Sequence, residues 1–183
     1  MRPALFCDRD GTLIHDAHYL SDPAEVRLLD GTVELLRACR AAGWALVVVT
    51  NQAGIARGLI TPAQYEAVRA RLDALLAAEG VTLDATYHCP HHPEFTGPCR
   101  CRKPGTALYE AAATDLALDL AQSVWIGDRW HDVAPALVFG GRGLLVPSED
   151  TPADEVARAG REAQCVPDRR GVVAAILPSG SPA

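Results

Sequence analysis

Phe6-Cys7-Asp8-Arg9-Asp10-Gly11-Thr12 is the stretch that decides the fold, because it places two aspartates directly after a short apolar run and before a glycine. Residues alternate sides along an extended strand, so Asp8 and Asp10 are expected to project the same way beyond the strand end. Two carboxylates held this close repel each other unless a cation lies between them. The stretch predicts a divalent metal site where Asp8 is a nucleophile for phosphoryl transfer and Asp10 handles the proton. Taken alone, it is also compatible with an acidic turn.

Three further segments supply the other groups of a phosphatase site, in chain order. Val47-Val48-Val49-Thr50-Asn51-Gln52 is a β-branched strand that ends in a hydroxyl and two amides, and Arg102-Lys103-Pro104 supplies two cations. Trp125-Ile126-Gly127-Asp128-Arg129-Trp130-His131-Asp132 is an apolar strand that ends in Gly-Asp, with a second acid four residues on. Singly, Thr50 or Lys103 is more often a strand cap or a solvated charge. Together the four segments predict one active site.

The four segments resemble the four motifs of the haloacid dehalogenase superfamily of phosphatases, and longer strings narrow the resemblance. The segments 8–12, 50–58 and 89–93 continuing to 99–104 are similar to the D-glycero-D-manno-heptose-1,7-bisphosphate 7-phosphatase family. The histidinol-phosphate phosphatase family is the nearest alternative. The string Thr-Asn-Gln-Ala-Gly-Ile-Ala-Arg-Gly favours the heptose family, although the loop between His91 and Cys99 is shorter than in some of its members.

The resemblance implies a Mg²⁺-dependent phosphomonoester hydrolase that works through an aspartyl-phosphate and removes the 7-phosphate of a heptose 1,7-bisphosphate. Mg²⁺ is expected on the carboxylates of Asp8 and Asp128, with the backbone carbonyl of Asp10 as a ligand implied by the resemblance. Lys103 and the Thr50 hydroxyl are expected to bind the non-bridging phosphoryl oxygens. The catalytic set is thus Asp8, Asp10, Thr50 and Lys103.

The resemblance also implies a substrate pocket, whose residues are Asp16, Tyr19, Thr50, Asn51, Gln52, Ala53, Arg102 and Arg129. Three other residues keep open roles. Asp132 is interpreted either as a residue that orients Lys103 or supports the metal ligands, or as an acid in the first turn of a helix. Arg57 and His131 are either pocket residues or, as the simpler interpretation has it, a surface arginine and a helix-end histidine.

A cluster of cysteines and histidines between residues 88 and 103 predicts a structural Zn²⁺ site. Three thiolates and one imidazole suit tetrahedral zinc, and four protein ligands leave no position for water. His88 and His92 are competing ligands, but strand alternation and the resemblance favour His91. The expected ligands are Cys89, His91, Cys99 and Cys101. Zinc would order this proline-rich loop, which directly precedes Arg102 and Lys103. Free thiols in a loop are the alternative.

Composition narrows the partners and the compartment. The chain has 183 residues, 49% of them hydrophobic, and 17 basic against 23 acidic residues give a net charge of −6. No basic stripe is present, so nucleic acid and anionic membrane are poor partners. The resemblance implies a small phosphorylated sugar as the partner, and we expect a monomer. With no leader and no membrane-length apolar segment, the chain is expected in the cytoplasm. The scattered Cys7, Cys39 and Cys165 are then predicted to be buried thiols.

Apolar strand candidates at 4–8, 45–50, 85–88, 123–127, 142–146 and 163–166 alternate with helical segments. This alternation predicts an α/β fold with an open, mostly parallel sheet. The resemblance implies that the sheet is doubly wound, Rossmann-like and of the haloacid dehalogenase type. The clearest helix spans 62–79, where Thr61, Pro62 and Gln64 suit its beginning. One apolar stripe along it is formed by Tyr65, Val68, Leu72, Leu75 and Leu76. Other helices are expected after Asp30, near Pro104, near Trp130 and over 152–162. We expect one domain over 1–183 without a large cap domain, and a disordered tail over 178–183.

Two functions of other classes use the cluster differently. A zinc-dependent hydrolase would place its chemistry at the cysteines, but four filled ligand positions leave no site for the attacking water. A non-catalytic zinc-binding interaction module would not need the acids, the threonine and the lysine together. Both are weaker interpretations than the phosphatase.

Overall fold

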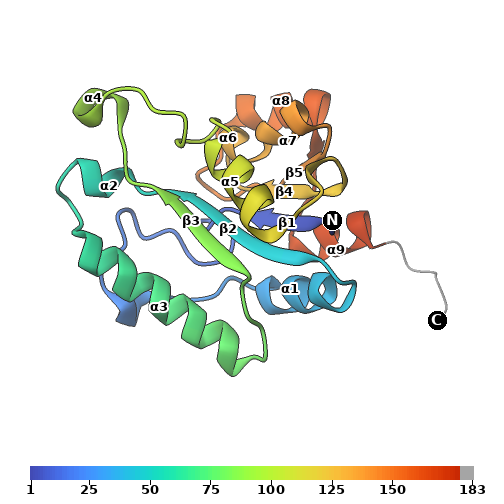
Figure 1. Ribbon diagram of the computed structural model, residues 1–183, viewed down its shortest axis with the longest axis horizontal. Coiled ribbons are helices and arrows are strands. Elements are labelled where there is room, and N and C mark those ends of the chain that lie inside the picture. Colours follow the sequence, from blue (N-terminus) through green and yellow to red (C-terminus); the bar gives the residue numbers. More distant parts are fainter. Residues whose placement is uncertain (178–183) are drawn as a thin grey trace.

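Six parallel strands form one sheet at the centre of the computed structural model, which describes residues 1–177 (Figure 1). Across the sheet the order is β3 (Ala85–Cys89), β2 (Ala45–Asn51), β1 (Ala4–Cys7), β4 (Val124–Gly127), β5 (Arg142–Leu145) and β6 (Gln164–Cys165). The chain moves outward from β1 to β3 on one side, then returns to β4 and moves outward on the other. The predicted doubly wound α/β sheet is confirmed. The tail predicted to be disordered lies outside the described residues.

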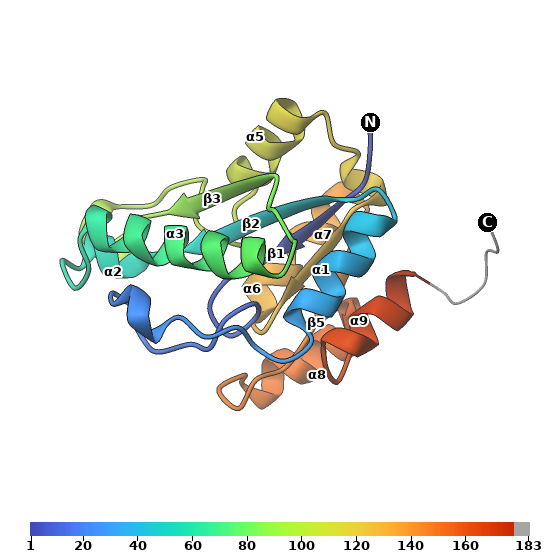
Figure 2. The same cartoon turned by 90° about the horizontal axis from the view of Figure 1, so that it is seen from below.

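Helices cover both faces of the sheet (Figures 1 and 2). One face carries α1 (Thr32–Ala41), α3 (Pro62–Ala78) and α9 (Arg169–Ile176). The other carries α5 (Ala107–Leu116), α6 (Trp130–Val133), α7 (Pro135–Phe139) and α8 (Ala153–Glu162). The connections hold the short helices α2 (Ala53–Ala56), α4 (Pro93–Thr96), η1 (Pro23–Glu25) and η2 (Leu120–Gln122). Within residues 1–177 no cap domain interrupts them, as predicted.

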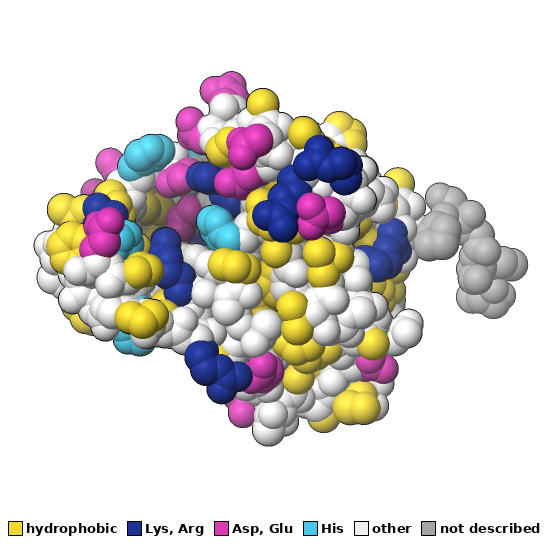
Figure 3. All heavy atoms as spheres, turned by 90° about the horizontal axis from the view of Figure 1, so that it is seen from above, with side chains coloured by type: hydrophobic (Ala, Val, Ile, Leu, Met, Phe, Trp, Pro, Cys, Tyr) yellow, Lys and Arg dark blue, Asp and Glu magenta, His cyan; other side chains and the backbone are white. Residues whose placement is uncertain are grey.

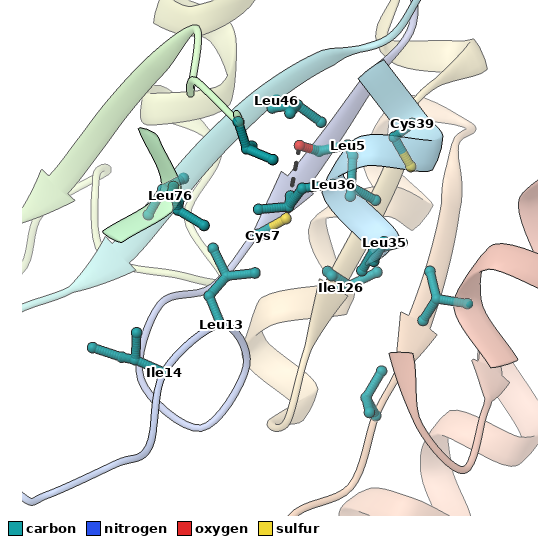
Figure 4. Close-up of a cluster of buried hydrophobic side chains, with 14 of the residues drawn as sticks. Leu5, Cys7, Leu13, Ile14, Leu35, Leu36, Cys39, Leu46, Leu76 and Ile126 are labelled. Atoms are coloured by element: carbon teal, nitrogen blue, oxygen red, sulfur yellow. Dashed lines mark hydrogen bonds between the residues drawn. The ribbon is translucent and has the colours of Figure 1, made fainter. Parts of the chain in front are cut away.

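The apolar residues of β1 alternate between two cores because successive side chains of a strand point to opposite faces. Leu5 and Cys7 contact the α1 side, where Leu35, Leu36 and Cys39 of that helix face them (Figure 4). Phe6 points the other way and stacks on Trp125 of β4, with ring centroids 4.9 Å apart. Burying each large apolar side chain contributes about 1.5–3 kcal/mol, so β1 is anchored from both sides. Asp8 and the residues after it therefore extend from the end of a rigid strand.

Helix α3 follows the sequence prediction at its beginning and along its buried face. Thr61 accepts a hydrogen bond from the Gln64 N–H, the Gln64 side chain accepts one from the Thr61 N–H, and Pro62 occupies the first turn. This capping box satisfies backbone donors that the helix itself cannot pair. The buried residues are Tyr65, Val68, Leu72 and Leu76. Their spacing is that of one helix face, as the pattern predicted.

Two expected helices are present with bounds that the structure now defines, and one expectation about a cysteine needs correction. The helix expected near Pro104 begins at Ala107, because Gly105 donates to the Arg102 carbonyl in a tight turn. The helix that begins at Trp130 ends at Val133 and a new one starts at Pro135, whose ring cannot continue the hydrogen-bond ladder. Cys7 and Cys39 are buried as predicted, but Cys165 is exposed, since it lies on the two-residue edge strand β6.

Among residues 1–177 there is no helix that combines the length and the apolar character needed to cross a membrane.

Candidate active site and zinc site

A cleft of about 410 Å³ lies at the carboxyl ends of β1, β2 and β4, where parallel sheets of this type bind ligands. Acidic, basic and histidine side chains gather around a hollow on this face of the molecule (Figure 3). The cleft lining includes all of the predicted pocket residues: Asp16, Tyr19, Thr50, Asn51, Gln52, Ala53, Arg102 and Arg129. A larger hollow of about 740 Å³ between η1 and α3 contains none of them. The structure thus brings residues from distant parts of the chain to one site.

Lys103 lies beneath the cleft and joins the first and last motifs. Its ammonium lies 2.5 Å from Oδ1 of Asp8 and 2.7 Å from Oδ1 of Asp132, and it donates to the Val49 carbonyl at 2.7 Å. Burial alone would lower the pKa of Lys103, but the carboxylates of Asp132 and Asp8 outweigh burial and raise that pKa above its usual value. Lys103 is therefore a fixed cation beside the expected nucleophile, and Asp132 is its partner.

Asp8, Asp128 and Asp132 can place one carboxylate oxygen each within 4.8 Å of the others. Burial raises the pKa of Asp8, although Lys103 opposes the effect, and burial together with Asp132 raises the pKa of Asp128 to about 6. Such buried carboxylates gain strongly from a further cation, and oxygen donors are those that Mg²⁺ prefers. Gly11 leaves room for this group, because a Cβ there would lie 2.6 Å from Oδ2 of Asp128. The residues therefore fit a Mg²⁺ ion.

The Asp10 carboxylate is held by two neighbours. Arg9 donates to it through Nε and through Nη2, the latter at 2.9 Å, and Nε2 of Gln52 donates at 2.9 Å. The same Gln52 nitrogen donates to Oγ1 of Thr50 at 2.9 Å. The ends of β1 and β2 are thereby linked through polar side chains. Arg9 was not predicted as a site residue, and nothing in the spacing of the motif distinguishes it from a surface arginine.

Asn51 is engaged with the backbone of the zinc loop. Its Oδ1 accepts from the Lys103 N–H at 3.0 Å, and its Nδ2 donates to the Lys103 carbonyl at 3.3 Å. Both hydrogen-bonding ends of the amide therefore fix the peptide that carries Lys103, while the residue also lines the cleft. This geometry gives Asn51 a role in positioning the lysine beyond the pocket role that the resemblance implied.

The wall of the cleft opposite Lys103 is a tight loop. His18 and Tyr19 have φ values of 47° and 60°, in the left-handed region that non-glycine residues rarely adopt. The Tyr19 ring lies so close to Gly54 that a Cβ at that position would be 2.7 Å from Cδ1. Asp16 caps the loop by accepting from the His18 N–H at 2.9 Å. The strained backbone thus presents Asp16 and Tyr19 to the pocket.

The two pocket arginines have different surroundings. Arg129 forms two hydrogen bonds with Glu155 of α8, at 3.0 and 3.2 Å, so a carboxylate already balances its charge. Among residues 1–177, Arg102 donates only to the backbone carbonyl of His91, at 3.4 Å. Arg102 is therefore the cleft arginine better able to bind a ligand anion.

Two hydroxyl residues of the loop after β5 hold Asp128 and were missed by the sequence analysis. Ser148 donates to Oδ2 of Asp128 at 2.9 Å, and Thr151 donates to the backbone carbonyl of Asp128 at 2.7 Å. Loop hydroxyls about twenty residues after a motif give no spacing signal. Only the fold brings them to the site.

The residues with open roles are now placed. Asp132 contacts Lys103 and also accepts from the Arg129 N–H at the beginning of α6, so both interpretations describe it. His131 lines the cleft, with Nε2 3.3 Å from Oδ1 of Asp132. Arg57 lies outside the cleft lining, where Nη2 is 2.9 Å from Nε2 of His92.

The predicted zinc ligands converge at one point. Sγ of Cys101 lies 3.0 Å from Sγ of Cys89, 3.5 Å from Sγ of Cys99 and 3.2 Å from Nδ1 of His91. Sulfurs bound to one tetrahedral Zn²⁺ at about 2.3 Å lie about 3.7 Å apart, so the four atoms fit a zinc ion. All described cysteines are free thiols.

The competing histidines lie elsewhere. His88 stacks on Tyr65 with centroids 4.1 Å apart, and His92 begins α4, where it accepts from the Glu94 N–H. Of the three histidines near the cysteines, His91 alone belongs to the group that could hold a metal among the described residues.

Comparison with known proteins gives matches over most of the chain. The family described as polynucleotide kinase 3 phosphatase matches residues 4–134, and the HAD-hydrolase-like family matches residues 100–170. The D-glycero-beta-D-manno-heptose-1,7-bisphosphate 7-phosphatase of Escherichia coli (strain K12) is 42% identical over 150 residues, which cover 79% of this chain and 78% of that protein. The protein of the same name from Haemophilus influenzae is 39% identical over 137 residues, 73% and 74% of the two chains.

A solved structure is similar over nearly the whole chain. The crystal structure of D,D-heptose 1,7-bisphosphate phosphatase from B. bronchiseptica, complexed with magnesium and phosphate, superposes with a TM-score of 0.85 at 30% identity. The match covers 98% of this chain and 100% of that one.

Proposed function

Since the chain belongs to the haloacid dehalogenase-like hydrolases, within them to the D-glycero-beta-D-manno-heptose-1,7-bisphosphate 7-phosphatase family, and is a phosphatase, we propose that it removes the 7-phosphate of a heptose 1,7-bisphosphate. One observation carries the proposal. Asp8 lies at the end of β1 against the buried Lys103, beneath a cleft whose wall presents the arginine Arg102. A second cation that lines the same cleft as the reacting carboxylate suits a substrate with a second phosphate.

The reaction proceeds in two steps at Asp8. The Asp8 carboxylate attacks phosphorus, and the bond from phosphorus to the sugar oxygen breaks as Asp10 gives that oxygen a proton. Asp10 then takes a proton from water, whose oxygen attacks phosphorus and releases inorganic phosphate and the Asp8 carboxylate. Lys103 and the Thr50 hydroxyl hold the phosphoryl oxygens. Mg²⁺ on Asp8, Asp128 and the Asp10 carbonyl would, when bound, offset the negative charge of the phosphoryl group.

The histidinol-phosphate alternative differs in charge at the remote end of the substrate. Arg102 attracts a second phosphate but repels the cationic amine of histidinol phosphate. We therefore expect kcat/KM for heptose 1,7-bisphosphate to exceed that for histidinol phosphate by at least roughly 10²-fold, the scale of one or two charge-assisted contacts. A panel of phosphorylated sugars and histidinol phosphate, assayed by phosphate release with Mg²⁺, measures this ratio.

Two variants sharpen the assay. Arg102→Ala should narrow the ratio by weakening the bisphosphate reaction, whereas Arg100→Ala is a matched control because that side chain is 79% exposed and pairs with Glu110. Asp8→Asn should abolish turnover of every substrate. If histidinol phosphate proves the better substrate, the proposed substrate is wrong while the phosphatase assignment stands.

The remaining parts of the proposal concern the zinc, the chain and the compartment. Zn²⁺ on Cys89, His91, Cys99 and Cys101 would be structural, because four protein ligands complete its shell. The whole chain would form one domain that acts as a monomer. A cytoplasmic location would keep the three cluster thiols reduced. Neither nucleic acid nor membrane is proposed as a partner of this acidic chain.

A further inference from the structure

We propose that Arg9 is a positioning residue that fixes the Asp10 carboxylate for both proton transfers. This proposal rests on the function proposed above, in which Asp10 first gives a proton to the sugar oxygen and later takes one from water. The two oxygens involved occupy the same position in successive in-line attacks, on the side of the phosphorus opposite Asp8, so one fixed carboxylate can serve both. A carboxylate that serves both needs a defined place, since a displacement of about 1 Å can cost 10²-fold in rate.

The contacts of Arg9 are devoted to this one carboxylate. Its Nε lies 3.1 and 3.2 Å from the two Asp10 oxygens, and its Nη2 lies 2.9 Å from Oδ2. Its third nitrogen, Nη1, is buried and has no protein acceptor in residues 1–177. Arg9 as a whole is only 1% exposed. Burying a guanidinium is costly unless it is paired, and here the partner is Asp10.

The guanidinium is itself held by an aromatic stack. The Arg9 Cζ lies 5.5 Å from the centre of the Tyr65 ring, and Tyr65 stacks on His88 of β3 at 4.1 Å. Tyr65 belongs to the buried face of α3. Arg9 can therefore move little, because a rigid helix and the sheet support the face of its planar head group. Gln52 donates to the same Asp10 oxygen as Nη2 of Arg9, so these two side chains together hold the Asp10 carboxylate.

A simple structural ion pair would predict a different kinetic result from a positioning residue. General acid catalysis matters for a poor leaving group such as a sugar alkoxide and hardly at all for a good one such as 4-nitrophenolate. Loss of the contacts to Asp10 should therefore lower kcat/KM for the sugar phosphate and leave kcat/KM for 4-nitrophenyl phosphate nearly unchanged, since this constant reports the first step. A general loosening of the site would instead lower kcat/KM for both substrates alike.

The test compares Arg9→Lys and Arg9→Met with wild-type enzyme on heptose 1,7-bisphosphate and 4-nitrophenyl phosphate. Arg9→Lys keeps the charge but loses the planar guanidinium, whose nitrogens together contact both Asp10 oxygens. We therefore expect kcat/KM for the sugar to fall by about 10–10²-fold with KM nearly unchanged. For the aryl phosphate kcat/KM should stay within about threefold. Hydrolysis of the aspartyl-phosphate should become slow, so a burst of 4-nitrophenolate should precede the steady state.

Variants of the supporting ring provide the controls, should Arg9→Met fail to fold. Tyr65→Phe keeps the ring and should behave as wild type, whereas Tyr65→Leu should show the same substrate-selective loss as Arg9→Lys. Equal losses on both substrates, or no loss in Arg9→Lys, would overturn the proposal. If wild-type enzyme itself hydrolyses 4-nitrophenyl phosphate but not the sugar, the proposed substrate fails, and a simple alkyl phosphate replaces it in the comparison.

Discussion

At Asp128, a single hydroxyl controls the direction of a carboxylate that is expected to bind Mg²⁺. Ser148 donates to Oδ2 at 2.9 Å, and Gly11, which has no Cβ, leaves room for that same oxygen. Partners of metal ligands fix the ligand's orientation, and their loss commonly costs tenfold or more in metal affinity. Ser148 is therefore expected to matter for metal binding although it touches neither substrate nor metal.

We expect Ser148→Ala to raise the Mg²⁺ concentration for half-maximal activity by about tenfold while KM for the sugar changes little. Calorimetric titration with Mg²⁺ in the absence of substrate provides an independent measure. Ser148→Thr keeps the hydroxyl and is the matched control. An unchanged Mg²⁺ requirement in the alanine variant would show that Asp128 needs no help from this loop.

On the scale of elements, the zinc loop connects metal binding to catalysis through chain continuity. Cys101 is followed directly by Arg102 and Lys103, and the peptide of Lys103 is held from β2 by Asn51. The segment between His91 and Cys99 contains no buried residue, and its short helix α4 buries none of its side chains. Metal binding can supply on the order of 10 kcal/mol of folding free energy to such a segment. The loop should therefore be ordered by zinc and should order the lysine in turn.

Cys99→Ser is expected to lower the zinc content, from about one ion per chain, together with thermal stability and activity. Elemental analysis, a thermal melt and the phosphate-release assay measure the three quantities on one preparation. Cys165→Ser is the matched control, because that thiol is exposed and lies outside the cluster. Wild-type protein that is free of zinc yet equally stable and active would contradict the structural role.

On the scale of the whole molecule, the sequence predicted what depends on local order and missed what depends on the packing of distant segments. The strands and the capped helix α3 follow from alternation and from Thr61, and these predictions are confirmed. Lys103 and Asp8 could be assigned to one active site from the order of the motifs, but their direct contact was not predicted. The roles of Arg9 and Ser148 could not be predicted from the sequence. Arg9 depends on contact with Tyr65, and Ser148 depends on contact with Asp128, and both contacts form only when the chain folds. The predicted site assignments stay predictions until variants are measured.

The stability of the whole molecule in acid should depend on Asp84, which joins three elements before β3. It accepts from the Leu46 N–H at 2.8 Å and lies 2.9 Å from Arg40 and 2.6 Å from Arg2. Burial alone would raise its pKa, but the Leu46 N–H and the two arginines lower it below its ordinary value. A carboxyl whose folded pKa is depressed stabilises the fold above its unfolded pKa of about 3.9, and this contribution disappears as the pH falls through the folded pKa.

Asp84→Asn should therefore cost about 1–3 kcal/mol of unfolding free energy at pH 7, the range for hydrogen bonds to a charged group. As the pH falls through the lowered folded pKa, wild-type Asp84 becomes protonated and loses the same charge, so the gap between the two proteins should be smaller in acid than at pH 7. Urea unfolding at both pH values measures the difference. Asp115→Asn serves as the matched control, because among residues 1–177 that carboxylate accepts only one hydrogen bond, from the Tyr87 hydroxyl at the surface. A gap of equal size at both pH values would mean that Asp84 acts through its shape, and not through its charge.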